Sequence, residues 1–444
     1  MERNGMMKIA QYYREGLAYF QARADRDIAQ NRTGDFTVTV TDAAGQPLAG
    51  RSVRLQHETH DFDFGANLFM LEQYKQPEQN ARYAQAWRRL FNTGVVPLYR
   101  EGTEPQQGVL RYAADTANDV YRRPPADRVV EWCRQNGVRA KGHPLFWHEF
   151  LPQWLPEDWP TLYPLIEKRF REIAGRYAGC IPVFDCVNEP ARVWDVHREH
   201  QHRQDSWKHL VPPRDYVKTI FDLARRYFPQ NALVLNEAVG AAFAEYHGRY
   251  SAYYLNIRDL LSRGTPIDRI GLQCHTYDSA AFHNVYDAER LYDVLDTYAE
   301  FGKPLVLSEV SIPSEPDEEF QAEAAVYLYK VCFSHRNVDG IFWWNLTDDG
   351  VLTTRRRALG ENLPSTGLID GDYREKPAYR ALDRLINREW RTTVDAQTDA
   401  AGCVHFHGYN GSYAMEIDGR RSRLHLSGET GETQQTVVVS AAER

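Results

Sequence analysis

Two glutamates end two stretches that are predicted as buried strands, and carboxylates placed in this way can cleave a glycosidic bond. Residues 181–187 are mostly apolar, and a polar pair ending in Glu189 follows before Pro190, which has no N–H to continue a strand. Residues 304–309 repeat the pattern and end in Glu309. In a parallel barrel the carboxyl ends of the strands share one rim, where paired carboxylates act as acid, base or nucleophile. We therefore take Glu189 and Glu309 as the candidate catalytic pair.

An alternation of apolar strands and amphipathic helices predicts the scaffold for this pair. Most of eight strand-like stretches are followed by a helical one, and Gly137 and Gly302 stand where helix C-caps belong. Eight such alternations fit an α/β fold of the (β/α)8 TIM barrel type. The predicted strands are 64–69, 94–99, 139–147, 181–187, 232–236, 269–276, 304–310 and 340–345. The predicted helices are 83–91, 126–135, 162–177, 214–226, 242–263, 288–301, 319–334 and 377–388.

Both ends of the chain carry alternating apolar residues around the same turn sequence, Thr-Asp-Ala-Ala-Gly. We interpret each copy as a β-hairpin, the first preceded by a helix within residues 6–31. Two similar hairpins predict one small accessory β-domain built from both termini, although such turns are common enough for the repeat to be a coincidence. The alternating segments are 36–40, 52–56, 392–396 and 404–407. The predicted domains are 1–59 and 390–444 for the accessory β-domain and 60–389 for the barrel.

Polar and aromatic residues follow most of the predicted strands, at the same rim as the two glutamates. Any one of them alone would more often be structural, but acids, histidines and tryptophans that converge on one rim favour an active site. Adjacent strand residues point to opposite faces, so we expect Trp343 in the core and Trp344 at the site. In strand order the residues are His143, Trp147, His148, Asn188, Asn236, Glu237, Gln273, His275, Tyr277, Trp343, Trp344, Asn345 and Asp348.

Length and composition limit the remaining possibilities. The 444 residues are enough for one barrel plus a small domain, and the net charge of -8 argues against a nucleic-acid partner, because phosphate binding needs a basic face. The six cysteines form no C-x-x-C pair, which favours free buried thiols in a reducing compartment. No run is apolar enough for a membrane span, and no signal peptide is visible. We expect a cytoplasmic protein, although the trimmed form of a secreted one would look the same.

Seven short segments occur in an order that is typical of one enzyme family. They are residues 142–148 (Gly-His-Pro-Leu-Phe-Trp-His), 185–190 (Asp-Cys-Val-Asn-Glu-Pro), 271–275 (Gly-Leu-Gln-Cys-His), 307–309 (Leu-Ser-Glu), 344–348 (Trp-Asn-Leu-Thr-Asp), 370–372 (Asp-Gly-Asp) and 376–379 (Lys-Pro-Ala-Tyr). In this order they resemble glycoside hydrolase family 10, the family of retaining β-1,4-xylanases. The resemblance covers about residues 60–390, and the β-regions on both sides are similar to those of some bacterial and plant members.

The resemblance implies hydrolysis of xylan or xylo-oligosaccharides by double displacement. Glu309 would attack the anomeric carbon, and Glu189 would protonate the leaving oxygen and then activate water. Retention requires the two carboxyl groups about 5–5.5 Å apart, one ionised and one protonated. The substrate-binding residues that the resemblance implies are His143, Trp147, Asn188, Gln273, His275 and Trp344, with Asn188 at the sugar 2-OH and His275 on Glu309. It implies no cofactor and no metal, and the expected partner is an oligo- or polysaccharide.

The sequence departs from the family at positions that would grip the substrate. Val95, Val96 and Tyr99 stand within the segment where xylanases carry a Glu-Asn pair and a Lys, and Ser311 stands where an Asp orients the histidine. Near Leu352, a late Trp that covers the reacting sugar is missing. Exo action, or trimming of short oligosaccharides, therefore stays open beside endo action on long xylan.

Three consecutive arginines lie in the loop after the last predicted strand. A solvated charge run explains Arg355 and Arg356, followed by Arg357, most simply, and the alternative is a clamp for an acidic sugar, since the guanidinium fork matches a carboxylate. Arg100 would lie on the same rim. These residues extend the candidate substrate-binding set to a uronate-decorated glycan.

Two other functions would use the same residues differently. A barrel that binds sugar without cleaving it has no use for a close carboxylate pair. A metal-dependent hydrolase could use His143, His148, His275 and Asp348, but residues 65–68 lack the His-x-His that such barrels carry on the first strand. The histidines within 197–202 have poor spacing for a metal site. Glu237 is the rival carboxylate, which we expect to support the site and not to react.

Overall fold

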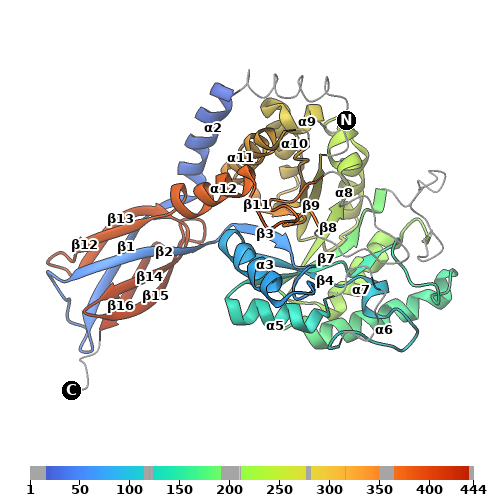
Figure 1. Cartoon of the computed structure of the whole chain (residues 1–444), viewed down its shortest axis with the longest axis horizontal. Helices are drawn as coiled ribbons and strands as arrows, with labels where there is room; N and C mark the ends of the chain where they lie inside the picture. The colour runs from blue at the N-terminus through green and yellow to red at the C-terminus, as the bar shows by residue number, and fades with distance from the viewer. Residues whose placement is uncertain are drawn as a thin grey trace.

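The structure is a computed structural model, and it describes residues 17–114, 120, 124–191, 210, 212–276, 282–315, 317–349 and 365–439. The chain forms a barrel wrapped in helices and an elongated β lobe at one side of it (Figure 1). The amino-terminal helix α2 (Leu17–Asn31) packs against the barrel before the chain enters the β lobe.

Eight strand positions form a closed ring in which every neighbouring pair is parallel. The third position is split, because Pro144 has no N–H to donate: Lys141 of β5 pairs with Val183, and β6 resumes the pairing with β7 at Phe146. The prediction of a TIM barrel is confirmed, and only the continuous strand 139–147 is interrupted. The strands are β3 (Asp63–Asn67), β4 (Thr93–Pro97), β5 (Arg139–His143), β6 (Phe146–Trp147), β7 (Val183–Asn188), β8 (Ala232–Glu237), β9 (Arg269–His275), β10 (Leu305–Ser311) and β11 (Val338–Trp343).

Helices cover the outside of the ring, and one predicted helix is wrong. Residues 242–263 are not continuous, because Gly248 adopts a left-handed conformation (φ 59°) and the Ser251 hydroxyl donates to Gly248 O in a turn. The helices are α3 (Pro77–Leu90), α4 (Arg100–Thr103), α5 (Ala126–Asn136), α6 (Trp159–Tyr177), α7 (Tyr216–Tyr227), η2 (Gly240–Ala244), α8 (Ala252–Ser262), α9 (Phe282–Tyr286), α10 (Ala288–Ala299), α11 (Glu318–Ser334), α12 (Pro377–Arg384) and η5 (Leu385–Glu389).

The β lobe consists of two sheets that share one apolar core. Their strand orders are β13-β1-β16 and β12-β2-β14-β15, and Val38, Leu55 and Met415 from the two sheets are buried together. An accessory β-domain made by both ends of the chain is therefore confirmed, while its boundaries at 59–60 and 389–390 stay a prediction. The strands are β1 (Thr33–Asp42), β2 (Ser52–His60), β12 (Thr393–Gln397), β13 (Cys403–Tyr409), β14 (Gly411–Ile417), β15 (Arg420–Leu426) and β16 (Gln434–Val439).

The prediction of two hairpins is wrong, because each turn carries the chain from one sheet to the other. Strands β1 and β2 lie in different sheets, as do β12 and β13, and the real pairs are β1 with β13 and β2 with β12. The two turns lie against each other, with Val40 N donating to Gly402 O at 2.8 Å. A hairpin and such an arch use the same turn residues, and burial of both strands in one shared core decides between them.

The described helices include none that is long and apolar enough to cross a membrane. All six cysteines are unpaired, but the expectation that they are buried is wrong for Cys180, which is exposed, and for Cys403, which is half-buried. The cytoplasmic location stays a prediction.

Arg32 joins the barrel to the β lobe at the point where α2 leads into β1. Its side chain is 5% exposed and donates to the carbonyl oxygens of Phe333 (2.6 Å), His335 (2.7 Å) and Val338 (2.5 Å) on the barrel. It also pairs with the Glu429 carboxylate of the β lobe at 2.8 Å. One guanidinium therefore satisfies groups from both parts of the molecule.

We expect Arg32→Met to lower the free energy of unfolding by about 3 kcal/mol, because it leaves three buried carbonyl groups without their donor. Denaturant unfolding measures the effect. The matched control is Arg54→Met, since Arg54 is exposed and lies 3.9 Å from the Asp395 carboxylate, where the loss should stay within about 0.5 kcal/mol. Equal losses in the two variants would contradict this role of Arg32.

Candidate active site

Glu189 directly follows β7 and is held by hydrogen bonds from neighbouring strands. Its backbone has a left-handed conformation (φ 53°), which costs a non-glycine residue about 1–2 kcal/mol and often marks a functional position. Its N–H donates to Asn236 O on β8 at 2.7 Å. Its Oε1 accepts from Gln273 Nε2 on β9 at 3.0 Å and from Asn188 Nδ2 at 3.3 Å.

Glu309 lies on β10 with only 5% of its surface exposed, and donors surround its carboxylate. Its Oε1 accepts from Asn236 Nδ2 at 3.0 Å and lies 3.9 Å from His143 Nε2. Its Oε2 lies 3.1 Å from His275 Nε2. Strands β8 and β9 thus each deliver one hydrogen-bond donor to a single buried carboxylate, and β5 places the His143 ring beside it.

Asn236 connects the two glutamates. Its Nδ2 donates to Glu309 Oε1 and to Asn188 Oδ1 (2.7 Å), while its Oδ1 accepts from the Ser308 hydroxyl at 2.5 Å. Gly271 leaves the necessary space, because a Cβ there would lie 2.3 Å from Asn236 Oδ1. The sequence placed Asn236 on the rim but gave it no role in the site. An Asn at the end of a strand between the two glutamate strands was the signal that could have found it.

A buried ion pair between Lys141 and Asp185 holds the His143 ring in place. Lys141 Nζ donates to Asp185 Oδ2 at 2.5 Å, and His143 Nδ1 lies 2.7 Å from the same oxygen. Burial alone would raise the pKa of Asp185, but the charge of Lys141 and the hydrogen bond from His143 hold that pKa below its usual value. An ionised Asp185 fixes the His143 ring and favours a proton on the ring nitrogen that faces it.

The surroundings of Glu309 favour its ionised form. Burial would raise the pKa of its carboxyl group, but the hydrogen bond from His275 and the charges of His143, His275 and Lys141 outweigh burial and lower that pKa. Glu309 is therefore suited to act as a carboxylate, as a nucleophile must.

Ser311 determines how His275 can meet Glu309. Its hydroxyl lies 2.9 Å from His275 Nδ1. A hydroxyl can donate to that nitrogen, which lets a neutral imidazole keep its proton on Nε2 and donate to Glu309. An aspartate at this position could only accept when ionised, and would force a proton onto Nδ1. The departure at Ser311 thus keeps the orientation of His275 while removing one negative charge.

Trp343 and Trp344 lie in different surroundings, as the alternation of strand residues predicts. Trp343 is fully buried and its Nε1 donates to Thr366 O at 3.1 Å. The Trp344 ring lies edge-on between two site histidines, 5.6 Å from His143 and 6.0 Å from His275. Trp344 is 2% exposed, so it forms a wall of the site with little open ring face.

A second aromatic group lines the side of the site next to β4. Trp147 stacks on Phe150 at 4.8 Å and lies 6.0 Å from Tyr99, whose ring is 5.3 Å from His143. Val95 and Tyr99 belong to one apolar cluster, so this side is hydrophobic where the family pattern has polar residues. The departure from the family pattern at Val95 and Tyr99 thus changes the character of this side of the site.

The arginines predicted for an acidic sugar are placed only in part. Arg100 is not available, because it is 9% exposed, pairs with Glu104 at 2.8 Å and donates to Leu165 O. Arg355 and Arg356 lie outside the described residues, as do Tyr277, Leu352 and the histidines within 197–202.

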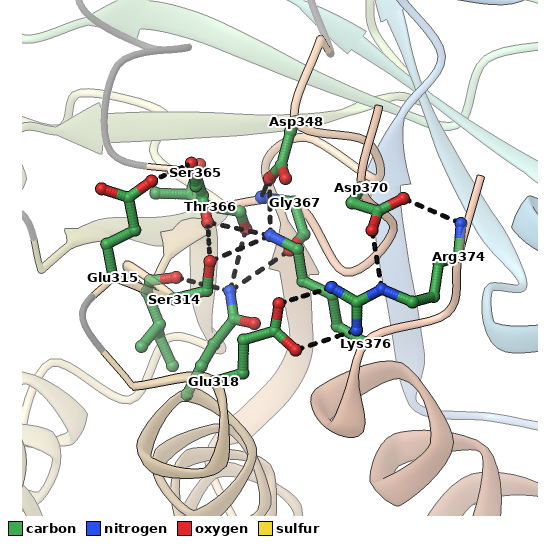
Figure 2. A network of polar contacts seen from close by, with 12 residues as sticks. Ser314, Glu315, Glu318, Asp348, Ser365, Thr366, Gly367, Asp370, Arg374 and Lys376 are labelled. Atoms are coloured by element: carbon green, nitrogen blue, oxygen red, sulfur yellow. Dashed lines mark hydrogen bonds and ion pairs between the residues drawn. The ribbon is translucent and has the colours of Figure 1, made fainter. Parts of the chain in front are cut away.

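The rim beside that arginine loop is held by Lys376, which Figure 2 shows between Asp348 and Ser314. Lys376 Nζ donates to Asp348 Oδ1 at 2.7 Å, to Ser314 Oγ at 3.0 Å and to Ser365 O at 3.1 Å. This contact fixes the chain on both sides of residues 350–364 against the exit of β10.

The other groups considered for a catalytic or metal-binding role are held by other partners. The Glu237 carboxylate accepts from Ala191 N and Ala238 N, both at 2.9 Å, and supports the turn that follows Glu189. Asp348 is engaged by Lys376, and His275 by Glu309 and Ser311. These contacts do not assemble the metal site proposed from His143, His148, His275 and Asp348.

Comparisons with known proteins agree with this arrangement. The model of the family described as "Glycosyl hydrolase family 10" matches residues 103–384. The chain is 24% identical to endo-1,4-beta-xylanase B of Thermotoga neapolitana over 283 residues, which are 61% of this chain and 75% of that protein. It is 23% identical to the anti-sigma-I factor RsgI6 of Acetivibrio thermocellus over 400 residues, 89% of this chain and 46% of that protein. The chain thus spans less than half the length of the second relative.

The fold is shared with solved structures. One is xylanase 10B from Thermotoga petrophila RKU-1 in complex with xylobiose, with a TM-score of 0.53, 20% identity, and coverage of 74% of this chain and 95% of that one. At this identity the likeness shows the fold alone. The family model covers well over half of the chain and includes both strands that deliver the glutamates. The chain therefore belongs to glycosyl hydrolase family 10.

Proposed function

We propose that this protein hydrolyses β-1,4 bonds of xylan or xylo-oligosaccharides with retention of configuration. The observation that carries the proposal is the shared amide of Asn236, which ties Glu309 on β10 to the Asn188-Glu189 pair on β7. Family membership and relatives named endo-1,4-beta-xylanase support the substrate class.

In this mechanism Glu309 is the nucleophile. Its carboxylate forms a bond to the anomeric carbon as the glycosidic bond breaks, while Glu189 gives its proton to the leaving oxygen. Glu189 then removes a proton from water, which attacks the anomeric carbon and releases Glu309. The two carboxyl groups are expected about 5–5.5 Å apart.

The neighbours divide the roles between the two acids. Hydrogen-bond donors from β8 and β9 stabilise the charge on Glu309, whereas Glu189 is the more exposed of the two acids and has amide partners on one oxygen. We propose that Asn188, Gln273, His143, Trp147 and Trp344 bind the reacting sugar and that His275 orients Glu309.

We expect Glu309→Ala to reduce turnover of an aryl β-xyloside by at least about 10⁴-fold, because no group remains to form the covalent intermediate. Glu189→Ala should lose less activity on a substrate with a good leaving group, and azide should restore part of it as a β-glycosyl azide. Steady-state kinetics measure the loss of turnover in the two variants, and NMR of the products identifies the glycosyl azide. The matched control is Glu237→Gln, whose amide keeps one acceptor for the Ala191 N–H and which should retain measurable turnover.

Retained turnover in Glu309→Ala, or an α-configured first product, would contradict the proposed mechanism. Rescue of Glu237→Gln by azide would transfer the acid/base role to Glu237.

The pH dependence should report the environment of Glu309. Because its pKa lies below the usual 4.5, the acid limb of kcat/KM should also lie below this value, with activity lost as falling pH protonates Glu309. His275→Ala removes a hydrogen bond and a charge that both lower this pKa, so the acid limb should move to higher pH. His275→Gln can keep a donor and should shift it less. A limb that stays in place in His275→Ala would contradict the role of His275.

The second candidate substrate is a short oligosaccharide, favoured by the hydrophobic side of the site formed with Val95 and Tyr99, or a uronate-decorated one, for which the three consecutive arginines of the sequence are the reason. We propose that Arg355 and Arg356 bind the acidic sugar. The double variant Arg355→Ala, Arg356→Ala should lower kcat/KM for uronate-bearing xylo-oligosaccharides about tenfold or more relative to neutral ones of equal length. Equal losses on the two substrates would contradict the clamp. Arg357→Ala is the control, with a smaller loss of selectivity expected.

A further inference from the structure

Three side chains with metal-binding atoms meet on the β lobe, away from the barrel rim. Asp399, Cys403 and His405 each offer one ligand atom, and these atoms all lie within 4.8 Å of one another. They come from the second Thr-Asp-Ala-Ala-Gly turn and the first residues of β13. A carboxylate, a thiolate and an imidazole together form a ligand set that suits zinc and related transition ions.

The turn fixes one oxygen of Asp399 and leaves the other facing the histidine. Asp399 Oδ1 accepts from Ala401 N at 2.9 Å and from Cys403 N at 2.8 Å. Asp399 Oδ2 lies 3.6 Å from His405 Nε2.

Strand β13 places the other two ligands on one face, because Cys403 and His405 are two residues apart. Each is paired with a threonine of β1: His405 with Thr37 and Cys403 with Thr39. His405 Nδ1 lies 2.9 Å from the Thr37 hydroxyl, which can accept a hydrogen bond from the proton on Nδ1 when the Nε2 lone pair binds an ion. Metal-binding histidines are commonly oriented by a hydrogen bond to the other ring nitrogen.

We propose that Asp399, Cys403 and His405 bind a divalent transition ion of the Zn²⁺ class, with water at the open fourth position. Zn²⁺ requires bond lengths of about 2.0–2.3 Å to such atoms, so small side-chain rotations would close the cluster around an ion. The Cys403 thiol loses its proton to solvent when the ion binds, and apparent affinity therefore rises with pH. Side-chain exposure of 48% for Asp399 and 64% for His405 leaves the site open to metal in solution.

The other copy of the turn shows what the site adds. Asp42 makes the same contacts, with Oδ1 accepting from Ala44 N and Gln46 N at 2.8 Å. Gln46 and Leu48 stand at the places that Cys403 and His405 occupy in the second copy. The turn is therefore formed without a thiol or an imidazole, and folding of the arch does not explain their presence.

The test uses tag-free, EDTA-treated full-length protein titrated with Co²⁺ alone, followed by absorption spectroscopy. We expect one Co²⁺ per chain with a thiolate-to-cobalt charge-transfer band, and displacement by Zn²⁺. Cys403→Ser should abolish the band, and His405→Ala should weaken binding at least about tenfold. Thr37→Val should weaken it about tenfold as well, because it removes the group that orients His405.

Two matched controls separate this site from unspecific binding. Cys180→Ser removes the exposed cysteine, and His407→Ala removes the next histidine on the same face, whose ring nitrogens contact Asp35 and Thr33. Both should bind Co²⁺ as the unchanged protein does. Absence of the band in that protein, its persistence in Cys403→Ser, or an equal loss in His407→Ala would overturn the proposal. Melting temperatures in EDTA confirm that each variant is folded.

Discussion

An ionised carboxylate removed from water is the constraint around which the barrel rim is organised. Glu309 is 5% exposed, and burial without partners would neutralise it. Asn236 and His275 supply hydrogen-bond donors from two strands, the His143 ring lies beside the carboxylate on a third, and each of the three is itself held by a further partner. Strands β5, β8, β9 and β10 must therefore keep their register relative to one another, because a shift of one strand would move its side chain away from Glu309.

The β lobe, which is built from both ends of the chain, must also be attached to the barrel. Arg32 makes this attachment, because its one side chain donates to carbonyl groups of the barrel and pairs with a carboxylate of the β lobe. The two turns of the lobe lie against each other, so strands from the two ends of the chain depend on one another although some 360 residues separate Asp42 from Cys403 in the sequence. Both junctions use buried polar contacts at places where apolar packing alone would not fix a unique arrangement.

Much of the barrel could be predicted from the sequence, because a buried parallel strand has a continuous apolar run and a polar end. The same logic placed Glu189 and Glu309 at one rim. The hairpins could not be predicted correctly, since the turns at Asp42 and Asp399 have identical local chemistry in an arch and in a hairpin. The break before α8 was missed because Gly248 and Ser251 interrupt an otherwise helical pattern. Asp399, Cys403 and His405 were not recognised, because their meeting depends on a turn and on cross-strand support from β1.

The departures from the family pattern are concentrated on recognition and leave the chemistry intact. Ser311 replaces an acid, yet its hydroxyl can still orient His275 toward Glu309. Val95 has no group that could contact a sugar hydroxyl, and Tyr99 offers a single phenol O–H in place of a charged group. Glu309 keeps its hydrogen-bond donors on β8 and β9 although the side next to β4 has changed, so the charge on Glu309 and the character of that side depend on different residues. Under the proposed function, a substitution at Val95 can therefore alter the contacts made to a sugar without removing a donor from Glu309.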